Sequence, residues 1–377
     1  MDSNVVVVGG GLTGCLTAYA LSVADVKVVL VEAGQIGRSA TGSSAGWIGA
    51  DPVASFVHLE KALGVRAARH AWQAWHRAGL DFGALLRRLN VKCDLEACGA
   101  VTVALTPEQL QRLRREQKAR QQANLETPFL SPRVMAGEIA LPALGGIRTR
   151  EGATIDPYRA ALGVAAAAVE RGARVFERSP VAKITFNRKT AEVQPAGGAI
   201  RARRVIIATG LPTALFKGLR RHFWFRQRFF ASTAPIPAKT RRALGGRRAV
   251  VRDVADPSHI IRWLDEERLL VAGADAESPP DRQGERVIVQ RTGQLMYELS
   301  TLYSEISGIA PQYGWDAAYA RTADGLPYIG PHRNYPHHLF AFGDSSPGVA
   351  GAYLASRILL RHHLEELDPA DEIFAFR

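Results

Sequence analysis

The sequence predicts an α/β protein. We expect a Rossmann-like, dinucleotide-binding domain assembled from separate chain segments, and a second domain built on an antiparallel β-sheet. Three observations support this fold class. The N-terminus carries a strand-glycine turn-helix pattern, apolar strands ending in glycine recur at 205–210 and 339–343, and short alternating runs fill about 223–319.

The N-terminal pattern is specific because its parts come in the required order. Val5–Val8 reads as a buried parallel strand and leads directly into Gly9, Gly11 and Gly14, which open a helix. The first glycine permits the tight turn, the second lets the backbone approach a pyrophosphate, and the third lets the helix pack closely on the strand. A second apolar strand ends at Glu32, whose carboxylate can accept hydrogen bonds from ribose hydroxyls. This pattern predicts dinucleotide binding but does not separate NAD from FAD.

The segment 37–47 favours FAD. It follows the acidic strand end and is rich in glycine, serine and threonine, so it can wrap a cofactor and donate hydrogen bonds to phosphates and ring edges. The alternative is a flexible surface loop. An NAD-dependent dehydrogenase is disfavoured because it leaves this loop and a glycine turn at 343–348 unexplained.

Several segments resemble the D-amino-acid oxidase superfamily of FAD-dependent oxidoreductases, which includes glycine and sarcosine oxidases, D-amino-acid dehydrogenase and γ-glutamylputrescine oxidase. Besides 37–47, they are 152–158, 181–184, 203–210 and the block 324–348, so the resemblance spans nearly the whole chain. It implies FAD, which we expect to be held without a covalent bond. The residues expected to contact it are Gly9, Gly11, Leu12, Thr13, Gly14, Glu32, Ala33, Arg38, Ser39, Thr41, Ser43, Ser44, Ala45, Gly46, Val181, Thr209, Gly210, Gly325, Gly343, Asp344, Ser345, Ser346, Gly348 and Val349.

The order of these motifs predicts a discontinuous FAD-binding domain at 1–90, 150–215 and 320–377. The substrate or lid domain then comprises 91–149 and 216–319. A chain of 377 residues with 47% apolar and 22% charged residues is ordinary for a globular protein of this size. Asp156 and Pro157 are expected to begin a helix, as are Thr106 and Pro107.

The substrate site is harder to read from the sequence. In relatives that oxidise free amino acids, an arginine about five residues before the Asp-Gly pair holds the substrate carboxylate, and this chain has Tyr319 there, with Arg321 two residues later. This departure puts simple D-amino acids and glycine in doubt. Further substrate-positioning candidates are Arg226, Gln227 and Arg262, whereas His259 is expected to be a buried, satisfied histidine rather than a base.

The expected function is therefore oxidation of the C–N bond of a small amine or N-substituted amino acid to an imine, which hydrolyses to a carbonyl compound. Reoxidation by O2 and by a quinone or carrier both stay open. Alternatives are an FAD-dependent D-amino-acid dehydrogenase, a tRNA-modifying FAD oxidoreductase of the same fold, and a non-catalytic flavoprotein.

The net charge of +12 leaves nucleic acid open as a less favoured partner, together with a peripheral membrane or quinone contact. The small-molecule substrate remains the main expected partner. Three cysteines and no zinc-ligand spacing predict a cytoplasmic protein without a structural metal. The oligomeric state is not predicted.

Overall fold

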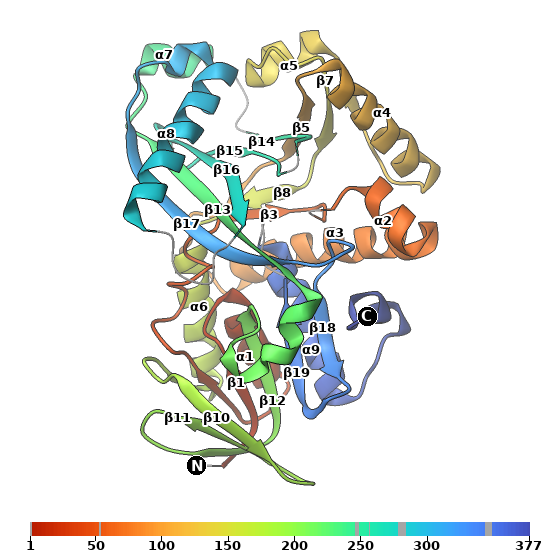
Figure 1. Ribbon diagram of the computed structural model, residues 1–377, viewed down its shortest axis with the longest axis vertical. Helices are drawn as coiled ribbons and strands as arrows, with labels where there is room; N and C mark the ends of the chain where they lie inside the picture. The colour runs from red at the N-terminus through yellow and green to blue at the C-terminus, as the bar shows by residue number, and fades with distance from the viewer. Residues whose placement is uncertain (1, 53, 246–248, 256, 278–283, 344–348) are drawn as a thin grey trace.

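The computed structural model describes residues 2–52, 54–245, 249–255, 257–277, 284–343 and 349–377. Two large β-sheets lie towards opposite ends of an elongated molecule, with helices and a small sheet between them (Figure 1). The expected fold class, α/β with a second antiparallel sheet, is confirmed by this architecture.

The first sheet contains the N-terminal strand. Its strand order is β10-β11-β12-β1-β2-β9, with β19 paired to β12 and β18 paired to β19. The strands are β1 (Asp2–Val8), β2 (Val28–Val31), β9 (Arg174–Phe176), β10 (Val181–Phe186), β11 (Ala191–Pro195), β12 (Ile200–Gly210), β18 (Tyr328–His332) and β19 (Tyr335–Phe342). The central β1 is parallel to both β2 and β12, and its valines 5–8 are buried, as the apolar run predicts.

Three helices cover this sheet and pack on one another. They are α1 (Leu12–Val23), α6 (Pro157–Glu170) and α9 (Ala350–Leu364) (Figure 1). α1 is buried along nearly its whole length because it contacts both α6 and α9. The expected start of α6 is confirmed: Pro157 is its first residue, and the Asp156 carboxylate accepts a hydrogen bond from the Arg159 backbone N–H.

The second sheet has the strand order β17-β13-β16-β15-β14-β5-β7-β6. Its strands are β5 (Ala100–Ala104), β6 (Phe129–Leu130), β7 (Gly145–Thr149), β13 (Trp224–Thr233), β14 (Val250–Asp253), β15 (Ile260–Trp263), β16 (Leu269–Glu277) and β17 (Pro311–Arg321). All neighbouring strands are antiparallel except β5 and β14, which are parallel.

The two faces of this second sheet have different neighbours. One face, which includes Phe229 and Ile261, packs against α8 (Glu285–Leu302). The other face, which includes Phe230 and Ile260, packs against Ala45 and Trp47, which follow the glycine-serine loop. Alternation along each strand therefore decides which side chains point towards the N-terminal motifs.

The remaining elements lie between or around the two sheets. The small sheet consists of β3 (Trp47–Gly49), β4 (Glu96–Ala97) and β8 (Gly152–Thr154). The remaining helices are α2 (Phe56–Leu63), α3 (Val65–Arg88), α4 (Pro107–Gln122), α5 (Pro132–Ile139), α7 (Ala238–Ala243) and the 3₁₀ segments η1 (Ala214–His222), η2 (Ser304–Ile306) and η3 (Pro369–Phe374). Thr106 caps α4 as expected, by accepting a hydrogen bond from the Gln109 N–H.

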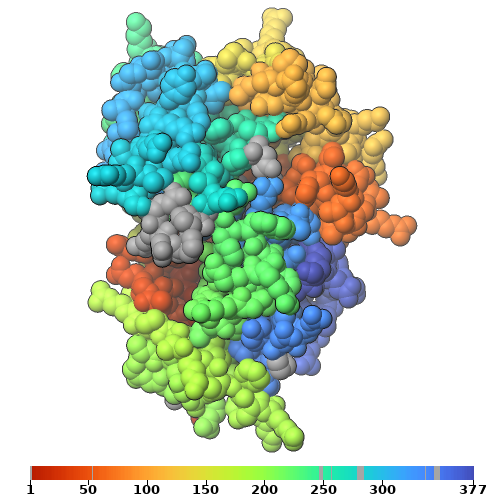
Figure 2. Space-filling model, viewed as in Figure 1, coloured from red at the N-terminus to blue at the C-terminus, as the bar shows by residue number. Residues whose placement is uncertain are grey.

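The chain crosses between the two sheets several times. Strands of the first sheet come from 2–31, 174–210 and 328–342, and those of the second come from 100–149 and 224–321. β17 continues to Arg321, two residues past the end of the predicted 216–319 segment. The space-filling view shows η1 and the start of β13 on the surface of this face, in green (Figure 2). There Trp224 is 56% exposed.

Candidate active site

A cavity of about 520 Å³ opens at the carboxyl ends of β1 and β2; we call it the N-terminal cavity. Its lining gathers segments that lie far apart in the sequence, which is where open parallel sheets bind ligands. The expected cofactor residues in its lining are Gly9, Gly11, Leu12, Thr13, Glu32, Ala33, Ser39, Thr41, Val181, Thr209 and Gly210. A volume of this size accommodates a drug-sized ligand or a large part of a dinucleotide.

The glycines of the fingerprint occupy positions that a side chain could not share. Gly9 has φ +111°, and a Cβ there would lie 2.5 Å from the Ala208 carbonyl oxygen. A Cβ on Gly14 would lie 1.8 Å from the Gly9 carbonyl oxygen. Gly11 is the N-cap of α1 and contributes no side-chain cap, so the positive end of the helix opens onto the N-terminal cavity. This cradle fits the diphosphate of a dinucleotide.

Two expected cofactor residues also hold the turn in place. The Glu32 carboxylate accepts hydrogen bonds from the backbone N–H groups of Gly10, at 2.6 Å, and Gly34, at 2.7 Å. Its oxygens retain lone pairs for further donors such as ribose hydroxyls. The Thr41 hydroxyl accepts from the Leu12 N–H at 2.9 Å and so caps α1. The sequence did not reveal these structural roles.

The glycine-serine loop is held against the second sheet. The Trp315 indole N–H donates to the Ser43 carbonyl at 3.0 Å, and the Ser44 hydroxyl donates to the Thr41 carbonyl at 2.8 Å. Ala45 is fully buried in the packing between the sheets. These contacts fix the course of the backbone past the N-terminal cavity.

The other expected cofactor residues lie in several places. Arg38 is exposed and lies over the Tyr158 ring, 5.6 Å from its centroid. The Val349 N–H donates to the Trp47 carbonyl at 2.9 Å, while Gly325 and Gly343 line a second cavity. Asp344, Ser345, Ser346 and Gly348 lie outside the described residues.

The second cavity has a volume of about 470 Å³ and lies between the second sheet, α2, α4 and the loop before β18. Six arginines contribute to its lining, so we call it the arginine-lined cavity. They are Arg112, Arg115, Arg120, Arg228, Arg252 and Arg321. The carboxylates in the lining are those of Glu116 and Asp253, so the cavity wall carries excess positive charge among the described residues.

Tyr319 lines this cavity but does not stand alone. Its hydroxyl donates to Asp275 Oδ2 at 2.5 Å. The same carboxylate accepts two hydrogen bonds from Arg228, at 2.8 and 3.0 Å, and both charged side chains are nearly inaccessible to solvent. Burial, followed by the negative charge of Asp275, raises the pKa of the Tyr319 phenol, so it remains protonated at neutral pH.

The structure places the substrate-positioning candidates in different environments. Tyr319 and Arg321 line the arginine-lined cavity, Arg321 as an exposed residue. Arg226 lies outside the lining and approaches Glu277 of β16 at 4.0 Å. Gln227 also lies outside it, because strand alternation turns the amide towards Asp316, to which it donates a hydrogen bond.

Arg262 was also expected to position the substrate, but it lies outside the cavity lining. It is buried beside Gly46 and donates to the Ile155 carbonyl at 3.2 Å. Burial lowers the pKa of its guanidinium to about 10, so it remains charged at neutral pH. Arg262 thus connects β15 to the segment that enters α6.

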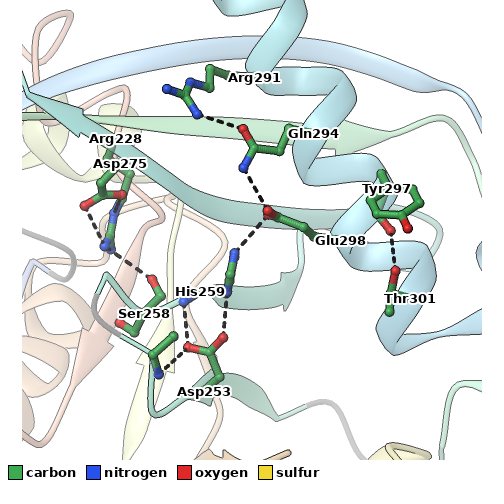
Figure 3. A network of polar contacts seen from close by, with 11 residues as sticks. Arg228, Asp253, Ser258, His259, Asp275, Arg291, Gln294, Tyr297, Glu298 and Thr301 are labelled. Carbon is green, nitrogen blue, oxygen red and sulfur yellow. Dashed lines mark hydrogen bonds and ion pairs between the residues drawn. The ribbon is translucent and has the colours of Figure 1, made fainter.

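His259 is satisfied as expected, but it is half-buried rather than buried, with 22% of its side chain exposed. Its Nδ1 lies 2.6 Å from Asp253 Oδ2 and its Nε2 lies 3.0 Å from Glu298 Oε2 (Figure 3). The hydrogen bond to Asp253, and then the charges of both carboxylates, raise the pKa of the imidazole against the opposing effect of burial. A protonated ring donates to both carboxylates and so joins β14 to α8.

Sequence reasoning missed Arg252 as a site residue. It lies on β14 on the same face as Val250, and its guanidinium carbon is 5.3 Å from the centroid of the Trp47 ring. Its signal was a charged residue inside a short apolar strand. Arg112 and Arg115, which lie on α4, were not predicted either, and the structure places both at the cavity.

Two other kinds of feature are absent from the described residues. Among those residues, no cluster of three or more histidine, cysteine, aspartate or glutamate side chains could hold a metal ion. In the same part of the chain, no helix is long and apolar enough to cross a membrane.

The parallel strands β12, β1 and β2, with this glycine cradle at their carboxyl ends, indicate a dinucleotide-binding protein. The sequence model of the family described as "DAO: FAD dependent oxidoreductase" matches residues 4–361. The chain therefore belongs to this family and is an FAD-dependent oxidoreductase. The resemblance and the FAD cofactor expected from the sequence are thus confirmed.

Relatives with assigned names cover most of the chain. It is 27% identical to γ-glutamylputrescine oxidoreductase of Escherichia coli, over 97% of this chain and 85% of the relative. It is 25% identical to glycine oxidase of Bacillus licheniformis, over 94% and 93%. The crystal structure of glycine oxidase from Geobacillus kaustophilus superposes with a TM-score of 0.81 at 20% identity, covering 100% of this chain and 98% of the other, and shows the same fold.

Proposed function

We propose that the protein oxidises the C–N bond of a small amine or N-substituted amino acid. The substrate loses a hydride equivalent from carbon and a proton from nitrogen, and the resulting imine takes up water to give a carbonyl compound and an amine. FAD supplies the two-electron acceptor when bound. The electrons then pass to O2 or to a quinone or carrier.

The observation that carries this proposal is the position of the arginine-lined cavity. Gly343 begins the glycine turn that the family resemblance implies to lie by the flavin, and the same resemblance implies that Gly325 contacts FAD. Both contribute to the wall of this cavity beside Tyr319 and Arg321. A substrate in this cavity would therefore lie next to the redox centre. The names of the relatives, a γ-glutamylputrescine oxidoreductase and a glycine oxidase, support an amine or amino acid as the substrate.

The residues of this chain would bind and orient rather than react covalently. The turn at Gly9 and Gly11, with Glu32, would hold the FAD diphosphate and ribose, without a covalent bond to the flavin. The first sheet would thus form the cofactor domain and the second would cover the substrate. With a tyrosine at 319, an α-carboxylate finds no arginine at the position that relatives use, which favours a substrate other than glycine or a simple D-amino acid.

An anaerobic titration tests the proposal. The purified FAD-loaded protein is mixed with primary amines, secondary amines, N-substituted amino acids and D-amino acids while the flavin absorption band is followed. We expect bleaching by a secondary amine or an N-substituted amino acid. The rate of recovery on readmitting air separates an oxidase from a dehydrogenase. Bleaching by D-amino acids alone would contradict the substrate class, and no bleaching by any compound would contradict the reaction.

A further inference from the structure

The arginine-lined cavity contains cations that have no ion pair with any residue that the structure describes. Arg228 is paired with Asp275, and Arg120 is held by Glu116 at 2.7 Å and Asp51 at 3.3 Å. Arg252 differs from both: within the described part of the chain, its guanidinium has no ion pair and no hydrogen bond, and its Nε is buried without a partner.

Nearby carboxylates are already occupied. Asp253, the residue after Arg252, accepts hydrogen bonds from the backbone N–H groups of Ala255 and His259 and from the His259 ring. Asp51 attracts Arg252 through space, but its carboxylate is bonded to Arg120 and Thr149. Arg252 is half-buried and its Nε is buried without a partner. Because a partly buried charge without a partner is unfavourable, an anion that enters the cavity would stabilise Arg252.

The protein holds Arg252 in position without using its hydrogen-bond donors. The guanidinium lies over the Trp47 ring, and Arg252 is paired in register with Thr102 of β5, which also lines the cavity. Stacking on an indole leaves the planar donors of the guanidinium available to a carboxylate. A fixed but unused donor set is the arrangement expected of an anion-binding residue.

Besides Arg252, a pair of cations lies nearer to solvent. Arg112 and Arg115 extend from α4, and both line the cavity while remaining exposed. Neither has a carboxylate within ion-pair distance among the described residues, and Arg115 makes only a 3.5 Å hydrogen bond to the Gln111 carbonyl. The cavity therefore offers an inner cation and, separately, a pair of cations at its mouth.

From this arrangement we propose that the substrate is an amine with two anionic groups, the inner one bound by Arg252 and the outer one by Arg112 and Arg115. The inference rests on the proposed function and specifies its substrate class. An N-carboxyalkyl amino acid has this chemistry, with two carboxylates on either side of an oxidisable secondary amine. Arg252 then supplies the charge that the sequence lacks at position 319.

Binding of redox-inert anions tests this inference without requiring turnover. Malonate, succinate and glutarate are titrated into the FAD-loaded protein by calorimetry, with propionate as the monocarboxylate. We expect at least one dicarboxylate to bind at least tenfold more tightly than propionate. Arg252→Met removes one partner of the charge pair that Arg252 forms with the bound carboxylate. We therefore expect this variant to bind dicarboxylates about 100-fold more weakly. Arg252→Lys, which keeps the charge but loses the planar fork, should weaken it about tenfold.

Matched variants separate the two anion positions. The double substitution Arg112→Met with Arg115→Met should weaken dicarboxylate binding but leave propionate binding unchanged. Arg114→Met is the control for the loss of one positive charge from the same helix, because Arg114 lies over Phe129 and outside the cavity lining. Equal binding of propionate and the dicarboxylates by the wild type would overturn the inference. This measurement does not depend on the folding of any variant.

Reduction of the flavin distinguishes failure of this inference from failure of the proposed function. N-methylethylamine, sarcosine and iminodiacetate carry no, one and two carboxylates on a secondary amine. We expect the third to reduce the flavin at the lowest concentration. Reduction by N-methylethylamine with no dicarboxylate binding would retain the amine oxidation and refute the dianionic substrate. Tight dicarboxylate binding with no reduction by any amine would retain the anion site and refute the proposed reaction.

Discussion

The buried ion pair between Arg228 and Asp275 joins two strands of the second sheet beside the arginine-lined cavity, and its contribution to the unfolding free energy can be measured. Only 6% of the Arg228 side chain and 2% of the Asp275 side chain are exposed. Replacing Asp275 by leucine removes the two hydrogen bonds from Arg228 and the one from the Tyr319 hydroxyl. Among the described residues, Arg228 then keeps the Ser258 carbonyl, at 3.3 Å, as its acceptor. Breaking a buried ion pair in this way costs about 3–5 kcal/mol of unfolding free energy.

A double-variant cycle separates the ion pair from simple packing. The Asp275→Leu, Arg228→Met and double variants are unfolded in urea with saturating FAD, and unfolding is followed by circular dichroism. The double variant should recover most of the loss, because two apolar side chains leave no buried charge and Tyr319 can donate to water in the cavity. A loss below about 1 kcal/mol in Asp275→Leu, or a double variant as unstable as the sum of the two single variants, would refute this reasoning.

Four further predictions concern the cofactor cradle, the His259 network, the cysteines and the attachment of FAD. Gly14→Ala should weaken FAD binding and cost about 1–3 kcal/mol of unfolding free energy, because the new Cβ overlaps the Gly9 carbonyl. Gly293→Ala, at an open position of α8, is the control. Equal FAD retention by the two variants would contradict the packing argument. The raised pKa of His259 means that its stabilisation is complete below its ordinary pKa of 6.5 and is lost as the pH rises through the raised value. The difference in unfolding free energy between wild type and His259→Gln should therefore shrink as the pH rises above 6.5, and a difference that widens would contradict this sign. Burial raises the pKa of Cys15 to about 12 and that of Cys93 to about 11, so alkylation by iodoacetamide at pH 8 should be slow at both, as peptide mass spectrometry can measure. Acid precipitation should release the FAD into solution, whereas flavin that remains on the polypeptide would contradict non-covalent binding.

The sequence predicted the cofactor side of the protein well because its signals are local. A strand, a glycine turn and a helix follow one another within 2–23, and each part has a steric reason that the structure confirms. Helix starts at Asp156 and Thr106 were predictable for the same reason, since a cap and its helix are neighbours in the chain.

The substrate side was predicted less well because it depends on distant pairings. Arg252 reaches the cavity only because β14 pairs in parallel with β5, about 150 residues earlier in the chain. Gln227 and Arg228 are adjacent in the sequence, yet strand alternation places one towards Asp316 and the other towards the cavity. No local pattern distinguishes these two outcomes before the register of β13 is known.

Product analysis tests the central claim, C–N bond oxidation dependent on FAD, most directly. The FAD-loaded protein is reduced anaerobically in a single turnover with the most effective amine, and the products are quantified by mass spectrometry. The account predicts one carbonyl compound and one amine for each flavin reduced. Flavin reduction without cleavage to these two products would contradict it.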